Sequence, residues 1–152
     1  MIESGAVSHR QLFRIYFEDT DAGGVVYHAS WLRFFERART DWLRGLGITQ
    51  AELARTRGQG FVVRALGIDY LRPARLDDLI RTELTVLEVR GASLHLEQRA
   101  FTEGTDDRLV DANVRIAAIQ IGTGRPTALP GALTDRLRAA ATLSRELRSD
   151  AT

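Results

Sequence analysis

The order of its hydrophobic patterns restricts the fold of this 152-residue chain most. One segment has the pattern of an amphipathic helix, and several segments with the pattern of β-strands follow it, joined by short connections. From about residue 28 to residue 46, large apolar residues recur at the spacing of one helical face. They are Trp31, Phe34, Phe35, Ala38, Trp42 and Leu46. The spacing predicts a long helix that stops at Gly45 and Gly47 and buries its aromatic face as the core of the protein.

Two shorter elements are predicted on either side of this helix. "QLFRIYF" alternates apolar and polar residues as far as Phe17, which indicates a first strand. Thr49 and Glu52 have the spacing of a capping box, so a shorter helix should start there and end at Gly58.

The pattern then changes to strands, roughly at residues 61–71, 79–89, 93–102 and 109–121. The breaks between them, at Pro73, Gly91 and "EGTDD", are too short for crossover helices, so the strands should pair antiparallel. Residues 132–148 form a weakly helical tail that we expect to be frayed. We therefore predict an α+β fold, a curved antiparallel sheet of about five strands around one long helix, in a single domain over residues 1–152.

Composition excludes several functions. The chain has no cysteine, so disulfides, thiolate metal sites and a cysteine nucleophile are ruled out. Its net charge of +1 gives no strong field for nucleic acid, although all 21 basic residues are arginine, which binds phosphate well. No apolar run is long enough to span a membrane, and "MIESGAVSHRQLFR" does not resemble an export leader, so we expect a cytoplasmic protein.

The candidate site is the stretch "FEDTDAGGVVYHAS" just before the long helix. Paired glycines, Gly23 and Gly24, let an external group approach main-chain N–H donors closely. Unpaired N–H groups at the helix start, near His28, can stabilise an oxyanion. A carbonyl polarised there could be attacked by Asp21, or by a water that Asp21 deprotonates. A thioester fits well, because its thiol leaving group departs with little acid assistance.

Other interpretations of the same residues remain open at this point. One aspartate could simply fix a turn or cap the helix, and the His28 imidazole could be no more than a polar cap. Asp19, Asp21 and His28 could also bind a metal, as in phosphatases with an aspartate nucleophile, but those enzymes need a parallel sheet. No nucleophile-elbow motif is present, and we assign no role to His9 or His95, the latter lying in a strand opposite the Leu94/Leu96 face.

The stretch "YFEDTDAGGVVYHASWLRFFERART" resembles the signature of the 4-hydroxybenzoyl-CoA thioesterase-like hotdog proteins, most closely the acyl-CoA thioesterases associated with the bacterial Tol–Pal system. A weaker likeness continues through "FVVRALGIDYLRPARLDD", so that the resemblance covers about residues 12–125. It implies a hotdog fold, a homodimer or homotetramer with active sites at subunit interfaces, and a substrate carried by CoA or by acyl carrier protein. No cofactor or metal is implied.

By this resemblance Asp21 is the catalytic nucleophile or general base, and the His28 backbone N–H polarises the thioester carbonyl while its side chain orders water or substrate. The residues Gly24, Val25, Val26 and Tyr27 are expected beside the thioester, Val62 and Val63 beside the acyl chain, and Arg64, Arg72 or Arg75 near the CoA phosphates.

One residue departs from the pattern: some relatives have a tyrosine where this chain has Phe17, and Tyr16 would face the opposite side of a strand. We therefore predict hydrolysis of acyl-CoA thioesters without a phenol-dependent step at that position. The alternative is a non-catalytic hotdog module that binds an acyl thioester or serves as a scaffold.

Overall fold

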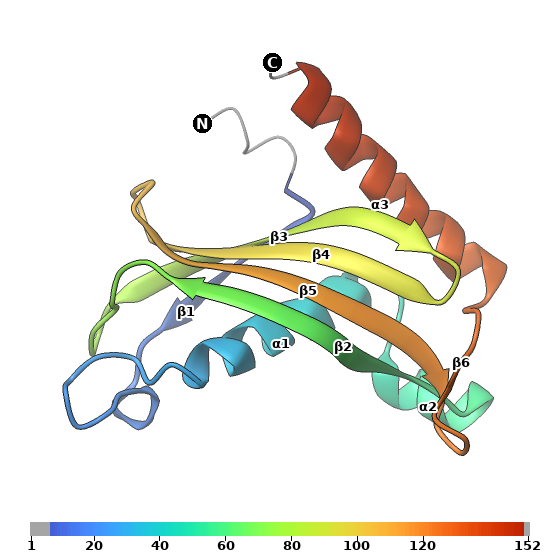
Figure 1. Ribbon diagram of the computed structural model, residues 1–152, viewed down its shortest axis with the longest axis horizontal. Helices are drawn as coiled ribbons and strands as arrows, with labels where there is room; N and C mark the ends of the chain where they lie inside the picture. Colours follow the sequence, from blue (N-terminus) through green and yellow to red (C-terminus); the bar gives the residue numbers. More distant parts are fainter. Residues whose placement is uncertain (1–6, 151–152) are drawn as a thin grey trace.

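The computed structural model describes residues 7–150, in which a curved antiparallel sheet wraps around one long helix (Figure 1). The strand order is β1-β3-β4-β5-β2, with the short β6 paired to β5. The strands are β1 (His9–Arg14), β2 (Gln59–Tyr70), β3 (Leu79–Arg90), β4 (Ser93–Thr102), β5 (Arg108–Gln120) and β6 (Arg125–Pro126). The helices are α1 (Ser30–Gly45), α2 (Gln50–Arg57) and α3 (Gly131–Asp150), with a single 3-10 turn at Phe17–Asp19. The predicted α+β architecture is confirmed.

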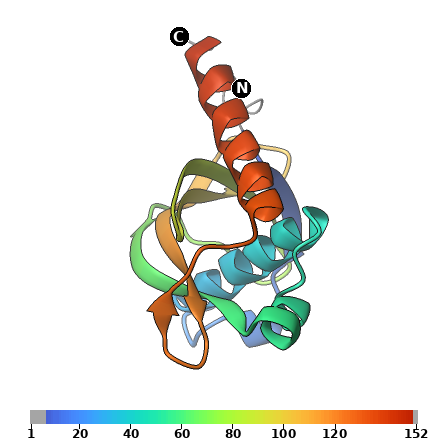
Figure 2. The same cartoon turned by 90° about the vertical axis from the view of Figure 1, so that its right-hand side faces the viewer.

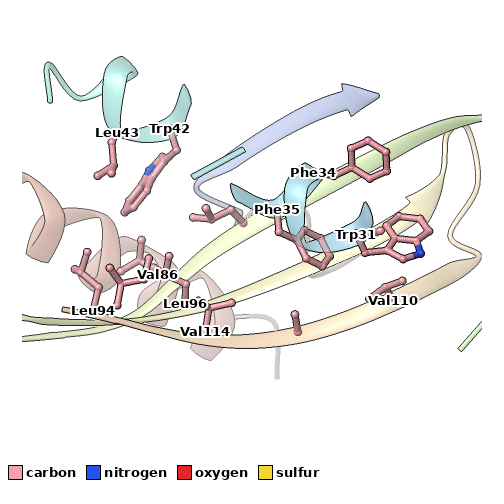
Figure 3. Packing of buried hydrophobic residues seen from close by; sticks show 14 of the residues in the cluster. Trp31, Phe34, Phe35, Trp42, Leu43, Val86, Leu94, Leu96, Val110 and Val114 are labelled. Carbon is pink, nitrogen blue, oxygen red and sulfur yellow. The ribbon is translucent and has the colours of Figure 1, made fainter. Parts of the chain in front are cut away.

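Helix α1 supplies the centre of the core. Trp31, Phe34, Phe35, Ala38 and Trp42 are all buried, as their spacing predicts. Their face meets inward-pointing residues of β3, β4 and β5, among them Val86, Leu96, Val110 and Val114 (Figure 3). On β4 the buried residues alternate with polar ones, so one face of the sheet covers α1 and the other faces away from it.

Two local predictions were wrong. The first strand ends at Arg14 instead of continuing to Phe17, because the Asp19 carboxylate accepts a hydrogen bond from the Tyr16 N–H (2.8 Å) and closes a 3-10 turn. Phe17 is consequently exposed. Helix α2 follows Thr49 as expected, but the Thr49 side chain makes no capping hydrogen bond.

The C-terminal segment forms one helix, Gly131–Asp150, that packs against the rest of the fold. Helix α3 packs beside β3, and its residues Leu137 and Ala141 join the hydrophobic core. Near its start, the Arg136 guanidinium donates to the Leu46 carbonyl just after α1. Figure 2 shows the helix continuing from there away from the sheet. None of the helices in the described part of the chain is long and apolar enough to cross a membrane.

Strand β2 forms one edge of the sheet and is the most exposed long strand. Among the described strands only β5 pairs with it, so its other edge offers backbone N–H and C=O groups that no strand of residues 7–150 uses. Its apolar residues Val62, Val63 and Leu66 are exposed as well. An open edge of this length with apolar side chains is a surface that a second strand could extend.

Candidate active site

The candidate site lies on a small hairpin-like loop over residues 19–27, ahead of α1. The Tyr27 N–H donates to the Asp19 carbonyl (2.9 Å), and the Asp21 N–H donates to the Val25 carbonyl (2.9 Å). The tip is closed by a bond from the Gly24 N–H to the Asp21 carbonyl (3.0 Å). Gly24 has a φ of 78°, a left-handed conformation that residues with side chains rarely adopt. The glycine therefore fixes the turn that presents Asp21.

The Asp21 carboxylate is exposed and only half engaged. Its Oδ1 accepts a hydrogen bond from the Gly23 N–H at 2.8 Å, an Asx-turn contact. A Cβ at Gly23 would lie 3.2 Å from the same oxygen, so a side chain there would crowd the carboxylate. Among residues 7–150, no hydrogen-bond donor or cation contacts the Oδ2 atom. One carboxylate oxygen is thus oriented by the loop, and the other is available to a substrate or water.

Asp19 has a different environment from Asp21. It is 7% exposed, accepts the Tyr16 N–H, and its Oδ1 lies 3.9 Å from Nη2 of Arg33. Asp19 therefore has a structural role: its carboxylate fixes the turn at residues 16–19. This agrees with the alternative that one of the two aspartates simply fixes a turn. In the described part of the chain, no group of three or more His, Asp or Glu side chains is arranged to hold a metal ion, so Asp19, Asp21 and His28 do not form such a cluster.

His28 lies just before α1, whose first residue is Ser30 and whose N-cap is Ala29. The expected helix start at residue 28 was therefore two residues early. Within residues 7–150 the His28 backbone N–H has no acceptor, whereas the Ser30 N–H donates to the Tyr27 carbonyl (2.8 Å). The His28 ring contacts the rings of two tyrosines, with centroid distances of 4.4 Å to Tyr27 and 6.2 Å to Tyr70. His28 is an exposed residue, and its N–H without an acceptor lies just ahead of the positive end of the helix dipole.

The neighbouring loop residues Val25, Val26 and Tyr27 differ in how far they are buried. Val25 is half-buried and bridges to Arg75, and Tyr27 is exposed. Val26 is 6% exposed, its N–H donates to the Ala74 carbonyl (2.8 Å), and its side chain belongs to the core. Of the residues expected beside a thioester, Val26 therefore offers it no side-chain surface.

Val62 and Val63 line a hollow of about 110 Å³ between β2 and α1. Its α1 side is polar and includes Glu36 and Arg39. The pKa of the Arg39 guanidinium is lowered from its ordinary value, because burial disfavours the charged form. The nearby Glu36 carboxylate offsets part of this shift. Arg39 donates to Oε1 of the fully buried Gln98 (3.0 Å), which holds this cation in place. The hollow combines an apolar wall with fixed charges.

Arg64 faces a larger cleft, of about 380 Å³, on the side of the sheet away from α1. It lies at a β-bulge of β2, where the extra residue redirects the side chain. Arg90, Arg115 and His95 share the cleft with one carboxylate, Glu88, which is paired to Arg90 at 2.8 Å. The cleft therefore carries an excess of positive charge, which suits an anionic ligand.

The other two arginine candidates lie elsewhere. Arg72 pairs with Asp107 (3.4 Å), and the Arg75 backbone N–H binds the Asp78 carboxylate (2.9 Å). His95 lies opposite the face of Leu94 and Leu96, as expected.

A single chain does not bring all of these residues together. Tyr70, at the end of β2, touches His28, because its hydroxyl donates to the His28 carbonyl at 2.9 Å. Arg64 lies six residues earlier on the same strand, and Val62 and Val63 lie farther still. At about 3.3 Å per strand residue, Arg64 is about 20 Å from Tyr70. Neither the hollow lined by Val62 and Val63 nor the cleft lined by Arg64 includes Asp21.

Two residues of this region carried no sequence signal that singled them out. Tyr70 is separated from His28 by 42 positions, so only the folded chain reveals their contact. Arg39 lies on the predicted helix among other charged residues, and nothing in the periodicity distinguishes a half-buried arginine from an exposed one.

A family model of the thioesterase-like superfamily matches residues 15–137. The acyl-CoA thioesterase YbgC of Haemophilus influenzae is 49% identical over 117 residues, which are 77% of this chain and 85% of that protein. A probable thioesterase from Bartonella henselae has a TM-score of 0.74 and 38% identity, covering 80% of this chain and 98% of that chain. A thioesterase of Thermus thermophilus, solved with coenzyme A and Zn, has a TM-score of 0.75 and 27% identity, covering 91% of this chain and 97% of that chain.

Proposed function

The chain belongs to the thioesterase-like superfamily of hotdog proteins, and from that premise we propose that it hydrolyses acyl-CoA thioesters to a free acid and CoA, with Asp21 and the His28 backbone N–H as its catalytic groups. The observation that carries the assignment is a half-free Asp21 carboxylate on the loop that leads to His28, whose N–H has no acceptor within residues 7–150 and lies just before α1. The first group can supply an oxygen to the carbonyl carbon, and the second can hold the carbonyl oxygen.

In the nucleophilic form of the reaction, Asp21 Oδ2 attacks the carbonyl carbon and the His28 N–H stabilises the resulting oxyanion. The C–S bond breaks, CoA departs as a thiolate, and a mixed anhydride remains on Asp21. Water then hydrolyses the anhydride to the free acid and restores the carboxylate. A thiol of pKa about 8.5 is a good leaving group, so a strong general acid is not required.

In the general-base form, Asp21 takes a proton from a water molecule while that water attacks the same carbon. The oxyanion, the thiolate and the products are the same, and the proton passes from Asp21 to the thiolate. In this form we propose that the His28 imidazole, which contacts the rings of Tyr27 and Tyr70, orders that water. Both forms need the Asp21 carboxylate and the His28 N–H.

We further propose that the active site lies between two copies of the chain. Val62, Val63 and Arg64 are about 20 Å or more along β2 from the Tyr70 end that touches His28. If two β2 edges pair antiparallel about a point near Leu66, the 62–64 segment of one copy lies next to the Tyr70 end of the other. Such pairing would also satisfy the free backbone groups of the edge. A further step to a tetramer is compatible with this pairing.

A charge on the β2 edge should break this assembly. We expect Leu66→Lys to shift the solution mass from two or more chains toward one, because lysine on an edge strand opposes pairing. Light scattering after size-exclusion chromatography measures this directly. Leu143→Lys adds the same charge to the exposed face of α3 and should leave the mass unchanged. A wild-type chain that runs as a single copy would contradict the shared site.

We assign the phosphates of CoA to the positive cleft that contains Arg64, Arg90 and Arg115. Arg64→Gln should raise KM for an acyl-CoA by roughly three- to tenfold, since a partly exposed charged contact contributes modestly. It should leave KM unchanged for the matching acyl-pantetheine, which lacks the nucleotide phosphates. Arg138→Gln, on α3, removes an exposed arginine outside the cleft as a control. Equal effects on both substrates would place the phosphates elsewhere.

The acyl chain is assigned to the hollow beside Val62 and Val63. The direct test of the function is a panel of acyl-CoA substrates of increasing length, assayed for release of free thiol, with acyl carrier protein thioesters as a second series. Hydrolysis of at least one member supports the proposal. Uniform inactivity, together with measurable binding of acyl-CoA, would favour the non-catalytic binding module. Action in the cytoplasm is part of this proposal.

A further inference from the structure

Tyr70 is the one residue of β2 whose side chain bonds to the segment just before α1. Its hydroxyl donates to the His28 carbonyl at 2.9 Å, and its ring meets the edge of the His28 imidazole at a centroid distance of 6.2 Å and an interplanar angle of 84°. The sheet thereby contacts both the backbone and the side chain of His28. Neither of the roles proposed for His28 accounts for this contact.

We infer that Tyr70 is a positioning residue for the hydrolysis proposed above, and that it acts by fixing the direction in which the His28 N–H points. The inference rests on the proposed function. The contact between Tyr70 and His28 is a feature of the structure whatever the activity.

The hydrogen bonds around His28 give the physical reason. Its N–H belongs to the peptide between Tyr27 and His28, whose carbonyl accepts the Ser30 N–H at 2.8 Å. Its carbonyl belongs to the next peptide, which the Tyr70 hydroxyl holds. With the peptides on both sides of one Cα fixed, neither φ nor ψ of His28 can rotate freely. Loss of the Tyr70 bond leaves the bond from Ser30 to Tyr27 in place but unties the turn at residues 27–30 from β2, so that the turn can shift and carry the His28 N–H with it.

No other side chain supplies this restraint in the described part of the chain. The N-cap of α1 is Ala29, which makes no side-chain capping bond, so the first turn lacks the usual serine, threonine or aspartate. Desolvation raises the pKa of Tyr70 above its ordinary value, so the phenol remains a neutral donor at neutral pH. An oxyanion hole depends on donors that are oriented before the charge develops, and a small misplacement therefore lowers the rate of the chemical step.

The fold should tolerate loss of the hydroxyl. Tyr70 is 47% exposed at the end of an edge strand, so water can replace the phenol at the His28 carbonyl. A water molecule satisfies the carbonyl but does not restrain its direction. Tyr70→Phe keeps the ring and removes the hydrogen bond alone.

We expect Tyr70→Phe to lower kcat about tenfold, which corresponds to about 1.4 kcal/mol, and to change KM by less than about twofold. The melting temperature should fall by less than about 5 °C. Tyr16→Phe is the matched control, because Tyr16 is exposed and its hydroxyl has no partner in the described part of the chain. A loss expressed in KM alone, or an unchanged kcat, would overturn the inference.

A second measurement is independent of turnover. In amide NMR spectra, Tyr70→Phe should shift the His28 and Ala29 resonances and speed the hydrogen exchange of these two amides, whereas Tyr16→Phe should not. If the wild-type protein hydrolyses no thioester, the proposed function fails and the NMR result still decides whether Tyr70 orients His28. Unchanged His28 and Ala29 amides in Tyr70→Phe would overturn the inference whatever the activity.

Discussion

Asp21→Asn should lower the hydrolysis of an acyl-CoA by at least about 10²-fold while the fold survives. Asparagine has nearly the shape of aspartate, and its amide oxygen can still accept the Gly23 N–H that orients the loop. It has neither the basicity nor the nucleophilicity of a carboxylate. The loss should appear in kcat, since the carboxylate acts on the reacting carbon and contributes little to holding CoA.

The measurement is release of free thiol from the best substrate of the acyl-CoA panel, with circular dichroism to check the fold. Asp135→Asn makes the same change on α3, away from the loop, and should keep full activity. Near-normal turnover of Asp21→Asn would remove Asp21 from the mechanism and leave the His28 N–H with no partner for catalysis.

Local sequence signals were enough to predict most of the secondary structure. The apolar spacing from Trp31 to Trp42 follows one helical face, so α1 and its buried side could be predicted without knowledge of the sheet. The strand at residues 93–102 has the predicted bounds because Gly91, with its positive φ, marks the turn before it. The two aspartates and two glycines of the loop also lie close together in sequence, and their chemistry could be inferred from it.

Predictions that depended on side-chain hydrogen bonds, burial or partners distant in sequence were less successful. Alternation extended the first strand to Phe17, but the Asp19 carboxylate captures the Tyr16 N–H and turns the chain before that residue. The sequence could not assign different roles to the two aspartates. The structure distinguishes them by burial, since Asp19 is buried and Asp21 is exposed. The contact between Tyr70 and His28 joins a strand end to a helix start, and no periodicity reports such a pair.

The C-terminal helix was underestimated for a related reason. Its apolar residues are small or widely spaced, and a weak amphipathic pattern alone does not predict stable packing. In the structure Leu137 is completely buried beside β3, and Arg136 ties the same turn to the end of α1. Helix α3 is therefore attached to the core through its first half.

This attachment predicts a large difference between two identical substitutions on one helix. Leu137→Ala should lower the free energy of unfolding by about 2–5 kcal/mol, because it removes a fully buried side chain and leaves a cavity. Leu143→Ala, where the side chain is 56% exposed, should change it by less than about 0.5 kcal/mol. Both variants keep a good helix former, so helix propensity does not separate them. Urea unfolding followed by circular dichroism gives both values, and equal small losses would mean that α3 adds nothing to the core.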